Sequence, residues 1–210
     1  MTQERKIAEI LKRLIKEYPE PKTALRFSTP FELLVATILS AQTTDAHVNK
    51  VTPGLFAKYR TVREYADAPL EALQKDMSSI NFYRTKAKNI REAAKRVQES
   101  FGGEVPRRME DLITLPGVAR KTANVLLNGA FGSNEGIAVD THVKRLAGRL
   151  GLTEQDDPVK IERELMAVTP QKEWGTLSHL LIFHGRRICT AKKPLHDRCV
   201  LYDICPSRDI

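Results

Sequence analysis

The stretch DLITLPGVARKTANVLLNGAFG, residues 111–132, decides the fold of this chain. Leu112 and Leu115 close one short helix, and residues 116–119, Pro-Gly-Val-Ala, make a tight hairpin. A second helix is predicted to begin at Arg120, because apolar residues recur from there at helical spacing. Those residues are Ala123, Leu126, Leu127 and Ala130. The pattern predicts two helices joined by a hairpin.

The start of the second helix has properties that suit a phosphate group. The first backbone N–H groups of a helix have no partner within it, and the helix dipole is positive at that end. Arg120 and Lys121 add two positive charges at the same place. The alternative is a corner between two helices that binds no ligand, since short glycine-containing turns are common in helical proteins.

The chain as a whole is basic. Its 210 residues carry a net charge of +8, and the sequence pI is near 9.5. A surplus of this size favours a polyanionic partner such as nucleic acid, although a solvated basic surface would give the same number. Helix-start signals recur along the chain, for example Thr29-Pro30 and Thr169-Pro170, and strand signals are nearly absent. We therefore expect an all-α protein.

Neither a secretory signal nor a membrane-spanning helix is expected. The first seventeen residues are charged throughout, and the most apolar segment, FELLVATIL (31–39), is short and contains Glu32. The odd number of cysteines also argues against a disulfide framework. These observations predict a cytoplasmic protein with no membrane partner.

All three cysteines lie in the segment CTAKKPLHDRCVLYDIC, residues 189–205. Cys189, His196, Cys199 and Cys205 are separated by six, two and five residues, a spacing typical of metal ligands. Thiolate and imidazole groups together bind either zinc or iron. Cysteines can also act as small buried apolar residues, but that role does not explain the spacing.

Five segments of the chain resemble, in the same order, those of the endonuclease III family of helix-hairpin-helix DNA glycosylases. A single motif would be weak evidence, whereas five in order, covering nearly the whole chain, are specific. The segments are LLVATILSAQTTD (33–45), NFYRTKAKNI (81–90), LPGVARKTAN (115–124), GIAVDTHVKRLAGRLGL (136–152) and HGRRIC (184–189).

The resemblance implies a two-lobed, all-α fold with a C-terminal metal-cluster loop. One lobe would be a helical barrel at residues 22–132, with the helix-hairpin-helix at 108–131. The other would join residues 1–21 to 133–210 and contain the cluster loop at 189–205. DNA and the substrate pocket would lie between the lobes.

Lys121 lies at the position of the family's catalytic lysine, and Asp140 at that of its catalytic aspartate. The resemblance therefore implies that Lys121 attacks the sugar and forms a Schiff base, activated by Arg120 and the helix start. Asp140 would stabilise positive charge on the sugar and help to deprotonate Lys121. From the residues alone, Lys121 could instead bind a phosphate and Asp140 could cap a helix.

The resemblance also implies residues that bind DNA. Gln42 would fill the space left by a flipped nucleotide, and Phe82, with Tyr83 beside it, would form an apolar wedge; core packing is the alternative for both aromatic residues. Asp45 and His142 would line the substrate pocket, with a buried structural hydrogen bond as the alternative for each. The hairpin residues Gly117, Ala119 and Arg120 would contact the DNA backbone.

Two positions near these residues depart from the family, which usually has glycine at both. Ala119 adds a methyl group that costs little where φ is negative but that could crowd a phosphate. Asn81, before the wedge, tolerates left-handed backbone better than most residues do.

The family holds a [4Fe–4S] cluster with four cysteines at the spacing seen here, so His196 replaces one ligand. We expect a [4Fe–4S] cluster with three cysteines and one histidine, with zinc as the second choice. Anchoring the segment at both ends would hold Lys192 and Lys193 in a rigid basic loop that reaches backbone phosphates.

The combination of Lys121 and Asp140 resembles the bifunctional branch of the family, in which base removal is followed by strand cleavage. We therefore expect a base-excision repair glycosylase that removes oxidised pyrimidines from double-stranded DNA and cleaves the abasic strand by β-elimination. The alternatives are a lyase that acts only on abasic sites and a DNA-binding protein without catalysis. A monomer is expected.

Overall fold

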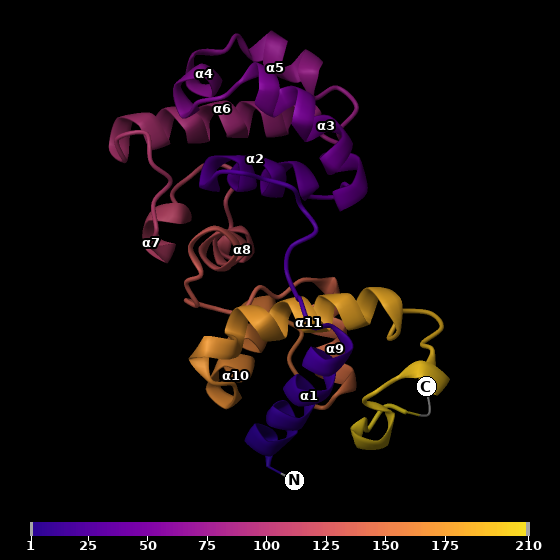
Figure 1. Ribbon diagram of the computed structural model, residues 1–210. Helices are drawn as coiled ribbons and strands as arrows, with labels where there is room; N and C mark the ends of the chain where they lie inside the picture. Colours follow the sequence, from indigo (N-terminus) through magenta and orange to yellow (C-terminus); the bar gives the residue numbers. More distant parts are fainter. Residues whose placement is uncertain (1, 209–210) are drawn as a thin grey trace. The chain divides into compact units, whose positions relative to one another are not determined.

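The computed structural model describes residues 2–208, and within them it contains helices and turns but no β-strand (Figure 1). The predicted all-α fold is confirmed. The chain forms two compact units: unit 1 combines residues 1–22 and 134–210, and unit 2 spans residues 23–133. Lys22 therefore belongs to unit 1 and Ser133 to unit 2, one residue away from the predicted boundaries at each end. In the described part of the chain, no helix is long and apolar enough to cross a membrane.

Unit 2 is built around α2, whose side chains are buried on nearly all sides. Helix α2 packs against α3, α6 and α8; α4 and α5 pack on α6, and α7 packs on α8 (Figure 1). The helices of this unit are α2 (Pro30–Ser40), α3 (Asp45–Lys58), α4 (Val62–Asp67), α5 (Leu70–Asp76), α6 (Tyr83–Ser100), α7 (Met109–Leu112) and α8 (Arg120–Phe131).

Unit 1 has a separate apolar core, to which the N-terminal helix α1 contributes one strongly amphipathic face. Helix α11 packs against α1 and α9, and α10 packs against both α1 and α9. The helices of this unit are α1 (Gln3–Glu17), α9 (Thr141–Arg149), α10 (Pro158–Val168), α11 (Trp174–Arg187) and the short 3₁₀ turns η1 (Gln171–Glu173), η2 (His196–Arg198) and η3 (Tyr202–Ile204).

The close crossing of α9 and α11 depends on Gly185. A Cβ atom at this position would lie 3.0 Å from the His142 Cβ and 3.2 Å from an Arg145 guanidinium nitrogen. A larger residue would therefore push α11 away from α9, the helix that begins directly after Asp140.

One predicted helix start is wrong. Thr29 caps α2 as expected, by accepting a hydrogen bond from the Glu32 N–H at 3.1 Å. Thr169, in contrast, ends α10 instead of starting a helix, and after Pro170 the chain makes the 3₁₀ turn η1 before α11 begins at Trp174. A threonine–proline pair suits extended backbone in general, so the pair does not distinguish a helix start from a helix end.

Candidate functional site

The hairpin between α7 and α8 has the shape that its sequence predicts, and α8 begins at Arg120. Gly117 has φ +80°, a conformation that side chains other than glycine rarely adopt, and an added Cβ would lie 3.1 Å from Asn89. Ala119 has φ −91° and makes no side-chain capping bond. The methyl group at 119 is therefore unstrained, and Ala119 has no side-chain oxygen with which to cap α8.

Lys121 lies in the first turn of α8 with an exposed side chain, directly after the exposed Arg120. Its neighbours in the helix, Ala123 and Asn124, are buried. The packing of α8 therefore fixes the backbone of Lys121 and leaves its amine accessible. Burial contributes nothing to the chemistry of this lysine, so the helix start and the neighbouring guanidinium are the local influences that remain.

Asp140 caps α9. Its Oδ1 accepts hydrogen bonds from the backbone N–H groups of His142 and Val143, each at 2.8 Å. Both bonds end on Oδ1, so Oδ2 takes no part in the cap. The capping role considered from the sequence is present, and it orients a half-buried carboxylate at the start of the helix.

His142 is held in one orientation by Arg145. The Arg145 Nη2 lies 3.1 Å from His142 Nδ1 and also donates to the Gly185 carbonyl at 2.8 Å. Because the guanidinium can only donate, Nδ1 must accept, and the neutral ring then carries its proton on Nε2. Burial lowers the pKa of His142, an effect that Asp140 opposes and the arginines reinforce. The other predicted pocket residue, Asp45, is the half-buried first residue of α3 in unit 2.

Gln42 and Phe82 are the only residues other than glycine with positive φ in the described chain, at +53° and +57°. Both side chains are exposed, and Phe82 is exposed to 65%. Tyr83, in contrast, is half-buried against the core of unit 2. Core packing, the alternative considered for both aromatic residues, therefore applies to Tyr83 and not to Phe82. The Asn81 side chain links the two exposed residues by donating to the Gln42 carbonyl at 2.8 Å.

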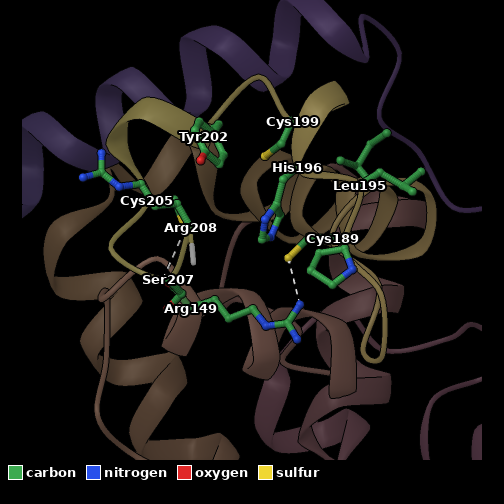
Figure 2. Close-up of a pocket in the computed structure, with 11 residues that line it drawn as sticks. Arg149, Cys189, Leu195, His196, Cys199, Tyr202, Cys205, Ser207 and Arg208 are labelled. Atoms are coloured by element: carbon green, nitrogen blue, oxygen red, sulfur yellow. Dashed lines mark hydrogen bonds between the residues drawn. The ribbon is translucent and has the colours of Figure 1, made fainter. Parts of the chain in front are cut away.

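The four candidate metal ligands, Cys189, His196, Cys199 and Cys205, line one small cavity of about 20 Å³ in unit 1. Figure 2 shows the His196 ring and the sulfur atoms of Cys189 and Cys199 pointing toward one another across this space. All three cysteines are free thiols. The segment that carries them contains the turns η2 and η3, which bring residues far apart in it to the same cavity.

Two side chains outside the segment contact these sulfur atoms. Arg149 Nη1 donates to Cys189 Sγ at 3.2 Å (Figure 2), and His184 Nε2 lies 3.4 Å from Cys199 Sγ. The other ring nitrogen of His184 lies 3.2 Å from the Tyr18 hydroxyl, and burial lowers the pKa of His184 to about 4. The Arg149 guanidinium can therefore stabilise a thiolate at Cys189, whereas burial raises the pKa of the Cys199 thiol and Cys205 Sγ donates to the Arg149 carbonyl at 3.5 Å.

The four ligand-type side chains are three thiols and one imidazole, groups that bind either zinc or iron. In the described residues, no three His, Cys, Asp or Glu side chains converge closely enough to hold one metal ion. A zinc ion needs four donors within about 2.0–2.3 Å of one point. An iron–sulfur cluster binds its protein ligands through separate iron atoms, so they stand around a cavity, as they do here.

Arg149 also shapes the basic loop after Cys189. Its guanidinium donates to the carbonyls of Thr190 and Ala191 at 2.8 and 2.9 Å. The Thr190 hydroxyl donates to the Lys193 carbonyl at 2.7 Å, which closes the loop. The side chains of Lys192 and Lys193 are exposed at its outer end.

Residues 35–171 match the family model described as the HhH-GPD superfamily of base excision DNA repair proteins. Endonuclease III of Synechocystis sp. is 52% identical to this chain over 206 residues, which cover 98% of the chain and 94% of the relative. This chain belongs to the endonuclease III family. Another member, endonuclease III of Bacillus subtilis, is 49% identical over 189 residues, covering 90% of this chain and 86% of that protein. The resemblance of the five segments is confirmed.

Residues 189–205 match the model described as the iron-sulfur binding domain of endonuclease III. The C-terminal loop of this family member is thus an iron–sulfur binding domain. Among solved structures, a trapped endonuclease III–DNA covalent intermediate has a TM-score of 0.93 and 44% identity, with 99% of this chain and 98% of that chain covered. A thermostable thymine-DNA glycosylase, at 22% identity and a TM-score of 0.86, shares the fold.

Several residues that connect distant segments of this endonuclease III fold could not be recognised as structurally important from the sequence. Their side-chain hydrogen bonds reach residues at least 15 positions away, except for the bond from Arg145 to His142. These residues are Lys86, Arg145, Arg149 and His184. Buried or half-buried basic residues in otherwise apolar helix faces were the only pattern that could have drawn attention to them.

Proposed function

We propose that this endonuclease III family member removes oxidised pyrimidines from duplex DNA and cuts the abasic strand through a covalent bond to Lys121. The observation that best supports this proposal is the exposed side chain of Lys121 in the first turn of α8, directly after a hairpin whose N-cap residue makes no side-chain capping bond. A relative 44% identical over nearly the whole chain has been solved as a covalent intermediate with DNA.

The reaction begins with the neutral amine of Lys121. Its nitrogen attacks C1′ of the damaged nucleotide, the bond from C1′ to the base breaks, and the base leaves with that electron pair and a proton. Opening of the sugar ring then transfers the C1′–O4′ electrons to O4′, which takes a proton, and leaves a protonated C1′=N Schiff base. Loss of a C2′ proton expels the 3′-phosphate by breaking the C3′–O bond. Water finally hydrolyses the imine and releases Lys121.

Asp140 has two tasks in this scheme. A carboxylate near the sugar stabilises the positive charge that develops as the base leaves, and it also accepts the proton that Lys121 must lose. The cap at the start of α9 holds Oδ1, so we assign Oδ2 to the substrate side.

The residues around the reacting sugar would expose and read the damaged base. Gln42 and Phe82, both exposed, would enter the duplex when the nucleotide flips out, with Tyr83 supporting the wedge from the core. Asp45 and His142 would bind the flipped base. The Nε2–H that Arg145 imposes on His142 is a donor suited to a pyrimidine carbonyl.

Contacts to the DNA backbone would come from two places in the chain. Gly117, Ala119 and Arg120 would present the first N–H groups of α8 to a phosphate, and Lys192 and Lys193 would contact another. A net charge of +8 supports double-stranded DNA as the partner. We further propose that the protein acts as a monomer in the cytoplasm, where chromosomal DNA lies.

We propose that Cys189, His196, Cys199 and Cys205 hold the iron–sulfur group as a [4Fe–4S] cluster. The shared cavity, and the absence of a single point of convergence among the described residues, support a cluster over zinc. The bound group would fix the ends of the basic loop, while the chemistry at the sugar stays with Lys121 and Asp140. Metal analysis of the purified protein tests the assignment: His196→Cys should retain about four iron atoms per chain, and zinc without iron would overturn it.

The proposed function is tested by borohydride trapping on a duplex that carries one thymine glycol. The native protein should form a covalent protein–DNA band, whereas Lys121→Ala and Lys121→Arg should not. The arginine variant is decisive, because it keeps a cation for phosphate binding but has no competent nucleophile. Trapping by Lys121→Arg would assign the nucleophile elsewhere. Trapping of the native protein only on a preformed abasic site would leave a lyase without base removal.

A further inference from the structure

Lys86 is a buried lysine that the proposed reaction does not use. It lies in the first turns of α6 with a side chain that is 94% buried, since 6% of the residue is exposed. Its Nζ donates to the Leu39 carbonyl at 2.8 Å, to the Ala41 carbonyl at 2.5 Å and to the Thr43 hydroxyl at 3.2 Å. Burying an ammonium is costly, so these contacts point to a specific role for it.

The three acceptors belong to the segment that leads into and out of Gln42. Helix α2 ends at Ser40, and the carbonyls of its last turn lack partners within the helix. Lys86 supplies donors to that turn from a different helix. Because the bonds lie on both sides of Gln42, they fix the backbone that gives this residue its φ of +53°.

Lys86 lies one helical turn after Phe82, so its side chain anchors the start of the helix that follows Phe82 to the segment around Gln42. Its backbone N–H donates to the Phe82 carbonyl at 3.1 Å, in the first turn of α6. The Asn81 side chain completes the connection by donating to the Gln42 carbonyl at 2.8 Å. Two loops about forty residues apart in the sequence, each with one left-handed residue, are thus joined by Lys86 and Asn81 within unit 2.

We infer that Lys86 and Asn81 are positioning residues that hold Gln42 and Phe82 as a preformed pair for insertion into DNA. This inference rests on the proposed roles of Gln42 and Phe82. Left-handed backbone at a residue other than glycine persists only where the surroundings impose it, and the bonds from Lys86 and Asn81 provide such surroundings on both sides of Gln42. A preformed pair needs no ordering when the nucleotide flips, which lowers the barrier to base removal.

Because Asn81 is exposed, the inference can be tested by a substitution at the protein surface. Asn81→Ala removes the bond to Gln42 without opening the core. Ser78→Ala, an exposed position in the same loop, is the matched control. Lys86→Met keeps the length of the buried side chain and removes its donors, and Lys88→Met on the exposed face of α6 removes the same charge.

The measurement is single-turnover base removal from a thymine-glycol duplex, beside borohydride trapping on a preformed abasic duplex. Asn81→Ala and Lys86→Met should slow base removal by about tenfold or more, since small misplacements of catalytic geometry cost this much. Trapping on the abasic duplex should change by less than about twofold, because a nucleotide without a paired base flips easily. The controls should match the native protein on both duplexes.

A double-mutant cycle separates positioning from a general structural effect. In the Gln42→Ala background, Asn81→Ala should cost less than about twofold, because the side chain that its hydrogen bond to the Gln42 carbonyl positions is gone. Full additivity, or equal losses on both duplexes, would overturn the inference even if Lys86→Met failed to fold. Failure of the native protein to act on thymine glycol would instead refute the proposed function, so the two results are distinguishable.

Discussion

Replacing Gly117 by alanine should damage the hairpin more than the same change at Gly132. Both glycines have positive φ, +80° and +64°, so both substitutions carry the left-handed strain of about 1–2 kcal/mol. Only at Gly117 would the new Cβ meet a neighbour, because Asn89 lies 3.1 Å away, whereas nothing lies within 4 Å at Gly132. The crowding adds roughly 1 kcal/mol, near the low end for overpacking.

The assay is urea unfolding of both variants beside fluorescence-anisotropy titration with an abasic duplex. We expect Gly132→Ala to lose about 1–2 kcal/mol of unfolding free energy with unchanged DNA affinity, and Gly117→Ala to lose about 2–3 kcal/mol. DNA affinity should fall only for Gly117→Ala, because the start of α8 moves. Adding Asn89→Ala should restore only about 0.5 kcal/mol to Gly117→Ala, because it removes the Asn89 amide nitrogen at 3.1 Å but keeps the Asn89 Cβ at the same distance. Equal destabilisation at the two glycines, or no rescue, would refute this account of the hairpin.

Three further predictions follow from particular contacts. Asp140→Asn should keep unfolding within about 0.5 kcal/mol of the native protein, since Asn also caps helices, but slow base removal at least about 100-fold; retained activity would assign Asp140 to capping alone. His179 lies in α11, and burial lowers its pKa in the folded protein, so the unfolded state takes up a proton at a higher pH than the folded state does. Unfolding free energy should therefore decline from pH 7 to 5, and less steeply in His179→Gln; identical slopes would contradict the burial effect. Lys192→Met and Lys193→Met should each reduce the slope of log affinity against log salt concentration by about 1, and an unchanged slope would remove that lysine from the DNA contact.

The sequence was sufficient to predict the local structure that depends on neighbouring residues. The start of α8 at Arg120 and the tight hairpin at residues 116–119 follow from turn chemistry and apolar spacing within one short stretch. The all-α fold and the family followed from five motifs in order. The pair Thr169-Pro170 shows the limit of reasoning from neighbouring residues. Thr29-Pro30 begins α2, whereas Thr169-Pro170 ends α10 and precedes the turn η1.

The contacts between distant residues could not be predicted. Lys86 looks like one more charged residue in α6 until the end of α2 is seen to surround its Nζ. Arg149 likewise lies forty positions before the sulfur and carbonyl groups that it binds. Such partners are set by how helices pack, and the apolar pattern that drives the packing carries no information on polar pairing.

The central claim is that the amine of Lys121 forms the bond to DNA. The most direct measurement is peptide mapping of the borohydride-reduced complex by mass spectrometry after nuclease and protease digestion. The account predicts a deoxyribose remnant on the nitrogen of Lys121 and on no other amine of the chain. A remnant on a different lysine or on the N-terminal amine, with Lys121 unmodified, would contradict it.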